Sequence, residues 1–312
     1  MINAAVQLGI PDRLAEGPAD AETLAKACGA HAPSLFRLLR AMQTLGLCEP
    51  GPGERFALTG MGRLLAAQTP GSARGRALFT GGMLWRQFGD MAHIVRTGEK
   101  GPSAPGDFGS MPPAELAVFQ QAMAESSIRA AREAALVYDF SRFSRLLDVG
   151  GGFGGVLAFL LQANAGLTGD VFDLGNVESG ARAYLAKAGL ADRAGFIGGD
   201  FFEAVTPGYD AYLLKYILHD WADEPALKLL TRVRAAADPG ATLVVLEQVV
   251  PDSLAAEFDH RAVIRGDLTM MTVGGKERTG EEYRRLLADA GFRLTRIVPT
   301  ASSFSVIEAA PA

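Results

Sequence analysis

The stretch that decides the fold is "RLLDVGGGFGGVLAFLLQA", residues 145–163. An apolar strand leads directly into a glycine loop, and the loop opens an apolar helix. A backbone without side chains can turn sharply here and approach a ligand closely. Gly150, Gly152 and Gly155 satisfy the G-x-G-x-x-G pattern of dinucleotide-binding folds, although this match alone is a weak signal. The stretch therefore predicts the first strand–loop–helix unit of a nucleotide-binding α/β domain.

Short apolar segments and helical segments alternate after this unit. Further strands are predicted at 169–174, 194–200, 209–218 and 241–250, with helices that include 176–189 and 224–237. This alternation indicates right-handed crossovers and a mainly parallel sheet. The last two apolar segments, "FRLTRIVPT" and "SSFSVIEAA", are joined by a tight turn and predict an antiparallel hairpin at one edge. The expected fold class is α/β, Rossmann-like, with a mostly parallel seven-stranded sheet.

The N-terminal part has a different pattern. Two helical segments, 20–30 and 32–47, precede "CEPGPGERFALTG", which is typical of a strand, a turn and a second strand. Helices followed by a hairpin predict a winged helix-turn-helix. We favour a dimerisation module over a DNA-binding one, because the net charge is -5 and no basic stripe accompanies the second helix.

The predicted domain organisation has three parts. A winged-helix-like dimerisation domain spans 1–75, a helical linker that contributes to the substrate cleft spans 76–140, and the catalytic domain spans 141–312. The linker part ends in one long amphipathic helix, 114–140, on which Met123 lies at helical spacing with other apolar residues.

Composition sets limits on location and partners. With only two cysteines, Cys28 and Cys48, the chain has no disulfide framework and no zinc cluster, which favours a reducing cytoplasm. No segment reaches 18 uninterrupted apolar residues, and the first residues do not resemble a signal peptide. We expect a cytoplasmic protein that binds neither membrane nor nucleic acid.

Acidic residues follow two of the predicted strands. Asp173 ends the second strand, and Asp200 with Phe201 follows the third. A carboxylate at a strand end can accept hydrogen bonds from ribose hydroxyls, and an acid followed by an aromatic residue suits an adenine. These positions predict a site for one nucleoside. No residues evidently form the second site that the nicotinamide half of NAD would need.

The segment "YILHDWADEP", residues 216–225, places His219 after the fourth strand. Open α/β sheets bind ligands at this carboxyl end, so the position favours a catalytic base over a structural histidine. A base also needs an orienting group on its other ring nitrogen. Glu247, at the end of the fifth strand, and Glu277, in "GGKERT", are both candidates for that group.

Six segments in order carry a resemblance to a known family: "LLDVGGGFGG", "FDL", "GGDFF", "LKYILHDWADE", "LVVLEQVVP" and "GGKERT". Together they resemble the metal-independent, S-adenosylmethionine-dependent O-methyltransferases of the caffeic-acid and bacterial natural-product type. The resemblance is strong over 145–312. "LGIPDRLAEGP", "LFRLLRAMQTLGL" and "FALTGMGRLL" are similar to that family's dimerisation domain, which implies a homodimer.

The resemblance implies a role for individual residues of this chain. The implied catalytic residues are His219, Glu247 and Glu277, and the implied cofactor-binding residues are Gly150, Gly152, Asp173, Asp200, Phe201 and Lys215. The helix predicted at 257–275 would line the pocket for an aromatic acceptor. Methionine side chains are flexible, so those in this pocket can adapt to a flat aromatic ring. The implied acceptor-binding residues are Met123, Asp267, Met270 and Met271, and His260 and Ile264 share a helix face with Asp267 and Met271.

Methyl transfer to a phenol sets the chemistry that these residues must perform. A phenolate is a far better nucleophile than a phenol, so a base must remove the proton, and the imidazole of His219 can do so in concert with attack. The sequence contains no cluster of metal ligands, and we expect no metal.

Three alternatives stay open at this point. The glycine pattern alone also fits an NAD-dependent oxidoreductase, and some relatives with this fold catalyse hydroxylation or decarboxylation. A winged-helix regulator that senses a nucleoside is the third. One departure from the family pattern is "DLG" at 173–175, where relatives often have "DLP"; it leaves Asp173 in place.

Overall fold

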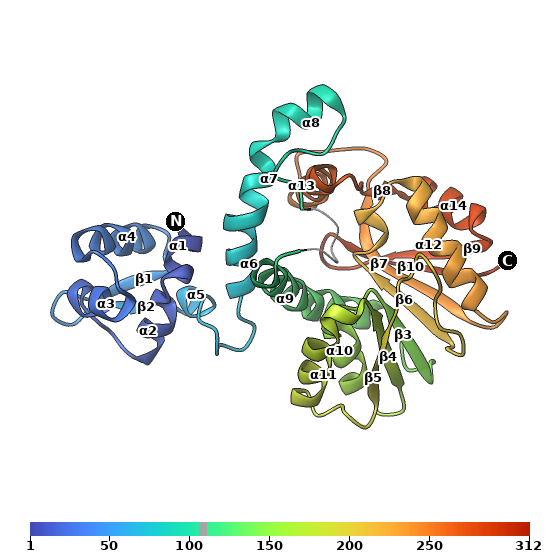
Figure 1. Ribbon diagram of the computed structural model, residues 1–312, viewed down its shortest axis with the longest axis horizontal. Coiled ribbons are helices and arrows are strands. Elements are labelled where there is room, and N and C mark those ends of the chain that lie inside the picture. Colours follow the sequence, from blue (N-terminus) through green and yellow to red (C-terminus); the bar gives the residue numbers. More distant parts are fainter. Residues whose placement is uncertain (106–110) are drawn as a thin grey trace. The chain divides into compact units, whose positions relative to one another are not determined.

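The structure, a computed structural model, describes residues 1–105 and 111–312; the side chains of Phe258 and Asp259 are not described. The chain forms two compact units (Figure 1). The first comprises Met1–Arg86 and Pro112–Glu125, and the second comprises Gln87–Met111 and Ser126–Ala312. Residues 106–110 of the predicted linker lie outside the described residues, and the division into 1–75, 76–140 and 141–312 remains a proposal.

The first unit is mainly helical. Asp20 caps the third helix by accepting a hydrogen bond from the backbone N–H of Thr23, and Gly29 ends it in the left-handed conformation. The predicted hairpin is present, with Cys48 paired to Leu58. Its elements are α1 (Ile2–Gln7), α2 (Ile10–Glu16), α3 (Ala21–Cys28), α4 (Ala32–Thr44), β1 (Cys48–Gly51), β2 (Arg55–Leu58), α5 (Gly60–Arg63), α6 (Arg74–Phe79) and the π-helical turn η1 (Thr80–Leu84).

The second unit is built on a mixed sheet with the strand order β5-β4-β3-β6-β7-β10-β9. The first five strands of this order are parallel, while β10 runs antiparallel to both β7 and β9. The strands are β3 (Arg145–Val149), β4 (Thr168–Asp173), β5 (Ala194–Gly198), β6 (Ala211–Lys215), β7 (Thr242–Val250), β9 (Phe292–Pro299) and β10 (Phe304–Pro311). The predicted parallel sheet with an antiparallel hairpin is confirmed.

One short strand was not predicted from the sequence. β8 (Arg278–Thr279) pairs in parallel with the end of β7, where Val249 lies opposite Arg278. Two residues carry no detectable strand periodicity, so only the folded chain shows this pairing. Because of it, the "GGKERT" segment lies beside the carboxyl end of β7.

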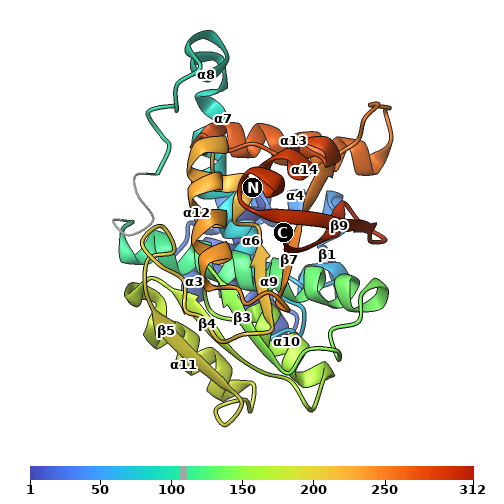
Figure 2. The same ribbon diagram turned by 90° about the vertical axis from the view of Figure 1, so that its right-hand side faces the viewer.

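Helices cover both faces of the sheet (Figures 1 and 2). Residues of α10, α11 and the C-terminal part of α9 form the core on one face, and residues of α12 and α14 form it on the other. Leu146 packs into the first core and its neighbour Leu147 into the second, as side chains alternate along a strand. Strands buried on both faces explain the continuous apolar segments of the sequence.

The helices that carry or connect these parts have the following bounds: α7 (Trp85–Gly89), α8 (Met91–Thr97), α9 (Pro113–Val137), α10 (Gly155–Ala163), α11 (Glu178–Lys187), α12 (Asp223–Ala236), α13 (Phe258–Val273), α14 (Gly280–Asp289) and the short 3-10 turns η3 (Gly175–Val177) and η4 (Leu218–Asp220). Among the described residues, none of the helices combines the length and apolar character that crossing a bilayer requires.

Candidate active site

The candidate site lies where the strand order of the sheet reverses. β3 is paired with β4 on one side and with β6 on the other, so the chain leaves β3 and β6 in opposite directions. Open α/β sheets bind ligands in the crevice at this switch point, outside the carboxyl ends of the strands. The glycine loop follows β3 and the His219 turn follows β6, which brings the two motifs to the same edge.

The glycine loop is held so closely that side chains do not fit. Gly150 has a φ of 71°, and a Cβ on it would lie 2.5 Å from Cδ1 of Ile217. A Cβ on Gly151 would lie 2.6 Å from Cγ of Asp148. The loop therefore presents bare backbone between β3 and the turn after β6. This is the surface that a nucleoside-type ligand needs for close approach.

The acid at the end of β4 holds the glycine loop in place. Oδ2 of Asp173 accepts a hydrogen bond of 2.7 Å from the backbone N–H of Gly152, and Oδ1 accepts one of 2.7 Å from Leu174. Burial raises the pKa of Asp173, while these two backbone hydrogen bonds act in the opposite direction. Each carboxylate oxygen has a second lone pair, so Asp173 can still accept a ligand hydroxyl.

The acid after β5 is in a different environment. Asp200 is exposed, and its Oδ1 accepts a hydrogen bond of 2.8 Å from the backbone N–H of Phe202. Phe201 and Phe202 pack edge-to-face with a centroid distance of 4.8 Å, and Phe202 contacts Trp221 in the same way at 4.7 Å. Aromatic side chains thus follow Asp200 directly, and the binding of an adenine by Asp200 and Phe201 remains a prediction.

Asp148 lies in β3, two residues before Gly150. Its side chain is buried, and Oδ2 has no hydrogen-bond partner among the described residues. Burial raises the pKa of Asp148 to about 7, although the charge of Lys215 lowers it. A buried acceptor without a partner is costly, and a ligand that brings a donor or a positive charge would relieve that cost.

Lys215 ends β6 and is buried. Its Nζ donates a hydrogen bond of 3.2 Å to Oγ of Ser126 and lies 4.5 Å from the centre of the Tyr216 ring. Its charge lowers the pKa of Asp148, and its contact with the cofactor remains a prediction.

The His219 imidazole is buried and paired with Glu277. Nδ1 lies 2.9 Å from Oε1 of Glu277, and Nε2 lies 3.6 Å from Oδ1 of Asp220. Because a carboxylate only accepts hydrogen bonds, Nδ1 is assigned the hydrogen and Nε2 is left for proton exchange. Burial lowers the pKa of His219, but the charges of Glu277, Asp220 and Glu247 outweigh it and raise the pKa to about 9.

The other predicted glutamate has a different position. Oε1 of Glu247 accepts hydrogen bonds from the backbone N–H groups of Ile217, Leu218 and His219, at 3.0, 2.6 and 3.2 Å. Its Oε2 accepts a hydrogen bond from the hydroxyl of Tyr283. Glu247 thus binds the backbone of the turn that carries His219, whereas Glu277 binds the ring.

Arg278 is a residue that the sequence analysis missed. It is fully buried, and it donates hydrogen bonds to the carbonyl oxygens of Leu218, at 2.9 Å, and Trp221, at 2.8 Å. It also pairs with Asp223 at 2.8 Å. Arg278 therefore fastens the His219 turn to the strand that follows Glu277. The signal available in the sequence was its place next to Glu277 in "GGKERT".

The packing between these two segments leaves no room for a side chain at Gly275. A Cβ there would lie 2.0 Å from the carbonyl oxygen of His219. That same oxygen accepts a hydrogen bond of 2.9 Å from the backbone N–H of Lys276. The glycine pair that precedes Glu277 is thus what allows Glu277 to reach the imidazole.

The predicted acceptor-binding residues are only partly assembled. Oδ1 of Asp267 accepts a hydrogen bond of 2.9 Å from the backbone N–H of Glu277, so at least one of its oxygens supports the His219 partner. Met270 and Met271 are half-buried on α13. Met123 belongs to the first unit. Contact of these four residues with an acceptor remains a prediction.

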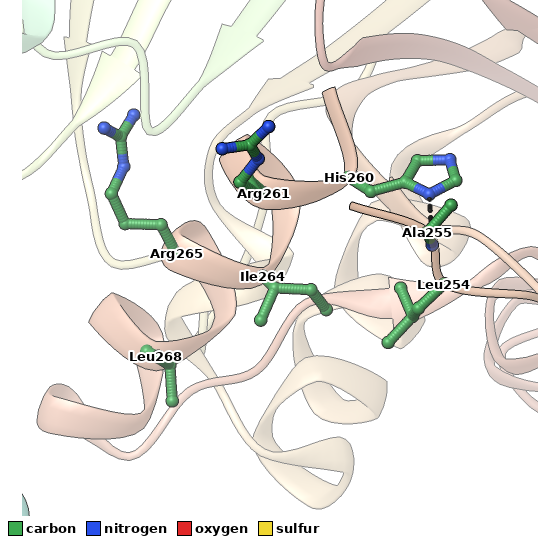
Figure 3. A pocket seen from close by; sticks show the side chains of 7 residues that line it. All are labelled: Leu254, Ala255, His260, Arg261, Ile264, Arg265 and Leu268. Atoms are coloured by element: carbon green, nitrogen blue, oxygen red, sulfur yellow. Dashed lines mark hydrogen bonds between the residues drawn. The ribbon is translucent and has the colours of Figure 1, made fainter. Parts of the chain in front are cut away.

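His260 and Ile264 do not share the environment of Asp267. They line a pocket of about 350 Å³ on α13 and the loop before it, together with Leu254, Ala255, Arg261, Arg265 and Leu268 (Figure 3). Nδ1 of His260 accepts a hydrogen bond of 3.0 Å from the backbone N–H of Ala255 (Figure 3). None of the predicted site residues lines this pocket. Among the side chains that the structure describes, no three from His, Cys, Asp or Glu are grouped to hold a metal ion.

Comparison with known proteins adds independent information. The O-methyltransferase domain family matches residues 106–293, and the O-methyltransferase dimerisation domain family matches residues 1–68. The phenazine O-methyltransferase PhzM of Lysobacter antibioticus is 37% identical over 315 residues, which cover 98% of this chain and 91% of the relative.

Two solved structures are also similar. LaPhzM has a TM-score of 0.94 and 35% identity, with 100% of this chain and 94% of that chain covered. NcsB1 from neocarzinostatin biosynthesis has a TM-score of 0.76 and 31% identity, with 100% of this chain and 95% of that chain covered. The NcsB1 structure contains S-adenosylmethionine and 2-hydroxy-5-methyl naphthoic acid.

Proposed function

The chain belongs to the S-adenosylmethionine-dependent O-methyltransferases of natural-product biosynthesis, and on that premise we propose that it methylates a hydroxyl group of an aromatic small molecule with His219 as the general base. The observation that carries this proposal is the pairing of Nδ1 of His219 with Glu277 at the carboxyl edge of β6, beside the glycine loop. The aromatic acceptor is supported by the phenazine and naphthoate named for two relatives.

The residues at the switch point fit S-adenosylmethionine. The glycine loop offers bare backbone at Gly150, and Asp148 has a buried oxygen that lacks a donor. Such an oxygen suits the positively charged amino group of this cofactor. The residues that would hold the cofactor are Gly150, Gly152, Asp173, Asp200, Phe201 and Lys215. The bound cofactor supplies a methyl group that is already activated by the positive charge on its sulfur.

In the proposed reaction, the residues of this chain remove one proton from the acceptor hydroxyl. In the proposed step, the O–H bond of the acceptor breaks, Nε2 of His219 takes the proton, and the electron pair stays on the oxygen. A phenol has a pKa of about 10 and an ordinary imidazole about 6.5. The acids around His219 raise its pKa to about 9, which brings the neutral imidazole much closer to the phenol in basicity but makes the neutral ring the minor form at neutral pH, so turnover should increase toward pH 9.

Glu277 and Glu247 support this step in separate ways. Glu277 keeps the hydrogen on Nδ1 and stabilises the imidazolium that forms. Glu247 accepts hydrogen bonds from three backbone N–H groups of the turn, which fixes the place of the histidine, and its charge adds less than that of Glu277 to the raised pKa of His219. Arg278 holds the same turn from its carbonyl side.

The test is methyl transfer from labelled S-adenosylmethionine to a panel of phenols, naphthols, phenazines and aromatic carboxylic acids, with products identified by mass. We expect one class of phenolic acceptor to gain a methyl group. Products that gain oxygen or lose carbon dioxide would instead support the hydroxylation or decarboxylation alternative. Binding of S-adenosylhomocysteine without any transfer to the panel would count against an aromatic acceptor.

We further propose that the chain forms a homodimer through its N-terminal domain. Besides the match to the dimerisation family, the first unit exposes several large apolar side chains, and such surfaces are typical of protein–protein contacts. They are Met1, Ile2, Leu8, Phe36, Leu45, Met61, Leu64 and Trp85. Sedimentation equilibrium should give twice the chain mass; a monomer at micromolar concentration would refute the proposal.

A further inference from the structure

Tyr216 makes a contact with His219 that none of the site predictions included. The two rings are stacked with a centroid distance of 4.4 Å and an angle of 12° between their planes. Phe304, at the start of β10, lies 4.8 Å from the same tyrosine ring. The tyrosine ring therefore links the imidazole to the antiparallel hairpin at the end of the chain.

The backbone at Tyr216 is unusual. Its φ is 55°, in the left-handed region, and among the described residues the only other non-glycine with a positive φ is Glu54. Glycine occupies this region without strain, whereas a bulky side chain rarely does. An outlier of this kind beside a reactive group indicates that the side chain has a task that glycine cannot perform.

The geometry of the imidazole shows what that task is. The ring is joined to the chain through Cγ and held at Nδ1 by the hydrogen bond to Glu277, which leaves a limited tilt of its plane by coupled rotation about the Cα–Cβ and Cβ–Cγ bonds. A parallel aromatic face opposes this tilt, because stacking is lost when the two planes are no longer parallel. The hydrogen bond to Glu277 and the stacking on Tyr216 together fix the direction in which Nε2 points.

We infer that Tyr216 is a positioning residue whose aromatic face fixes the plane of the His219 imidazole and favours the imidazolium that forms when His219 takes the acceptor's proton. An aromatic face attracts a cation placed over it, so the stack favours the protonated ring. This inference rests on the proposed role of His219 as general base. It adds a constraint on the ring plane to the hydrogen bond that Glu277 provides.

Other charged groups lie around the two stacked rings and must stay unchanged in a test. They are the carboxylates of Glu277 after α13, Asp220 in the same turn and Glu247 on β7, and the ammonium of Lys215, which lies 4.5 Å from the tyrosine ring. The three carboxylates favour protonation of His219. A substitution of Tyr216 leaves all four groups in the chain.

Two variants separate the ring from the backbone. Tyr216→Phe keeps the aromatic face, and Tyr216→Gly removes the face while it relieves the left-handed backbone. We expect kcat of the Phe variant to stay within about threefold of the parent. For the Gly variant we expect a fall of about 2- to 30-fold, with a smaller change in the KM for S-adenosylmethionine.

The decisive measurement is the NMR titration of His219 in the full chain labelled at histidine. The chain has four histidines, and the His219→Ala variant assigns the signal. We expect the pKa of His219 to be retained in Tyr216→Phe and to fall by about 0.4 to 1.5 units in Tyr216→Gly. Circular dichroism checks that both variants are folded.

Two results would overturn the inference. An unchanged pKa and kcat in Tyr216→Gly would show that the stack has no effect, and equal losses in the Phe and Gly variants would assign the effect to something other than the ring face. Failure of the general-base proposal would look different: His219→Ala would keep its turnover, while the titration of His219 would still report on the stack.

Discussion

Nδ1 of His219 lies 2.9 Å from Oε1 of Glu277, although 58 residues separate them in the chain. Glu247, whose side chain is also buried, binds the backbone of the same turn through three N–H groups instead of the imidazole. Two glutamates at one histidine therefore have separable tasks, and substitutions at each should give different signatures.

Replacing His219 with alanine should lower kcat by about 10²- to 10⁴-fold, the usual contribution of a general base. Binding of S-adenosylhomocysteine, measured by calorimetry, should stay within a few-fold of the parent, because the glycine loop and Asp173 are unaffected. Unchanged turnover in this variant would eliminate the general-base role.

Replacing Glu277 with glutamine should change the pH dependence of catalysis. Glu277 raises the pKa of His219, so its neutral analogue should shift the rising limb of the kcat/KM profile to lower pH. The plateau should fall by about 10- to 100-fold, because a charge-assisted hydrogen bond to the imidazolium is lost. A pH profile that keeps its shape would contradict the assignment of Glu277 as the ring partner.

Glu247→Gln serves as the matched variant, since it makes the same chemical change on the other glutamate. It should lower the free energy of unfolding by about 1.5 to 3 kcal/mol, because the backbone N–H groups of the turn lose a charged acceptor. Urea unfolding measures this loss. If Glu247→Gln shifted the pH profile as much as Glu277→Gln and left stability intact, the separation of their roles would be wrong.

Replacing Asp148 with asparagine should stabilise the protein at alkaline pH and weaken cofactor binding. The pKa of Asp148 is raised to about 7 in the folded chain, from 3.8. The carboxylate therefore disfavours folding progressively as the pH rises from about 4 to 7, and the penalty is full above that.

We expect Asp148→Asn to gain up to about 4 kcal/mol over the parent at pH 8, and this gain should vanish near pH 4. Thermal unfolding across this range measures the gain, and calorimetry with S-adenosylmethionine measures the accompanying loss of affinity. A stability difference that does not vary with pH would show that the buried carboxylate is not the cause.

The sequence determined the fold and predicted the place of the candidate site. Alternating apolar strands and helices from residue 145 onward predicted the parallel sheet, and the glycines after the first strand predicted the ligand-binding edge. These features are local: strand periodicity, glycine turns and the carboxyl ends of strands are read from a few neighbouring residues. His219 was predicted as the catalytic base in the same way, from its place after the fourth strand.

Only the tertiary structure decided which group each side chain at that edge contacts. Glu247 and Glu277 were equivalent candidates in the sequence, and their separation depends on the packing of Gly275 against the His219 carbonyl. The sequence patterns also did not predict that Arg278 is buried or that Tyr216 stacks on His219. Contacts between segments far apart in the chain depend on distances of a few ångströms, and no local pattern encodes those distances.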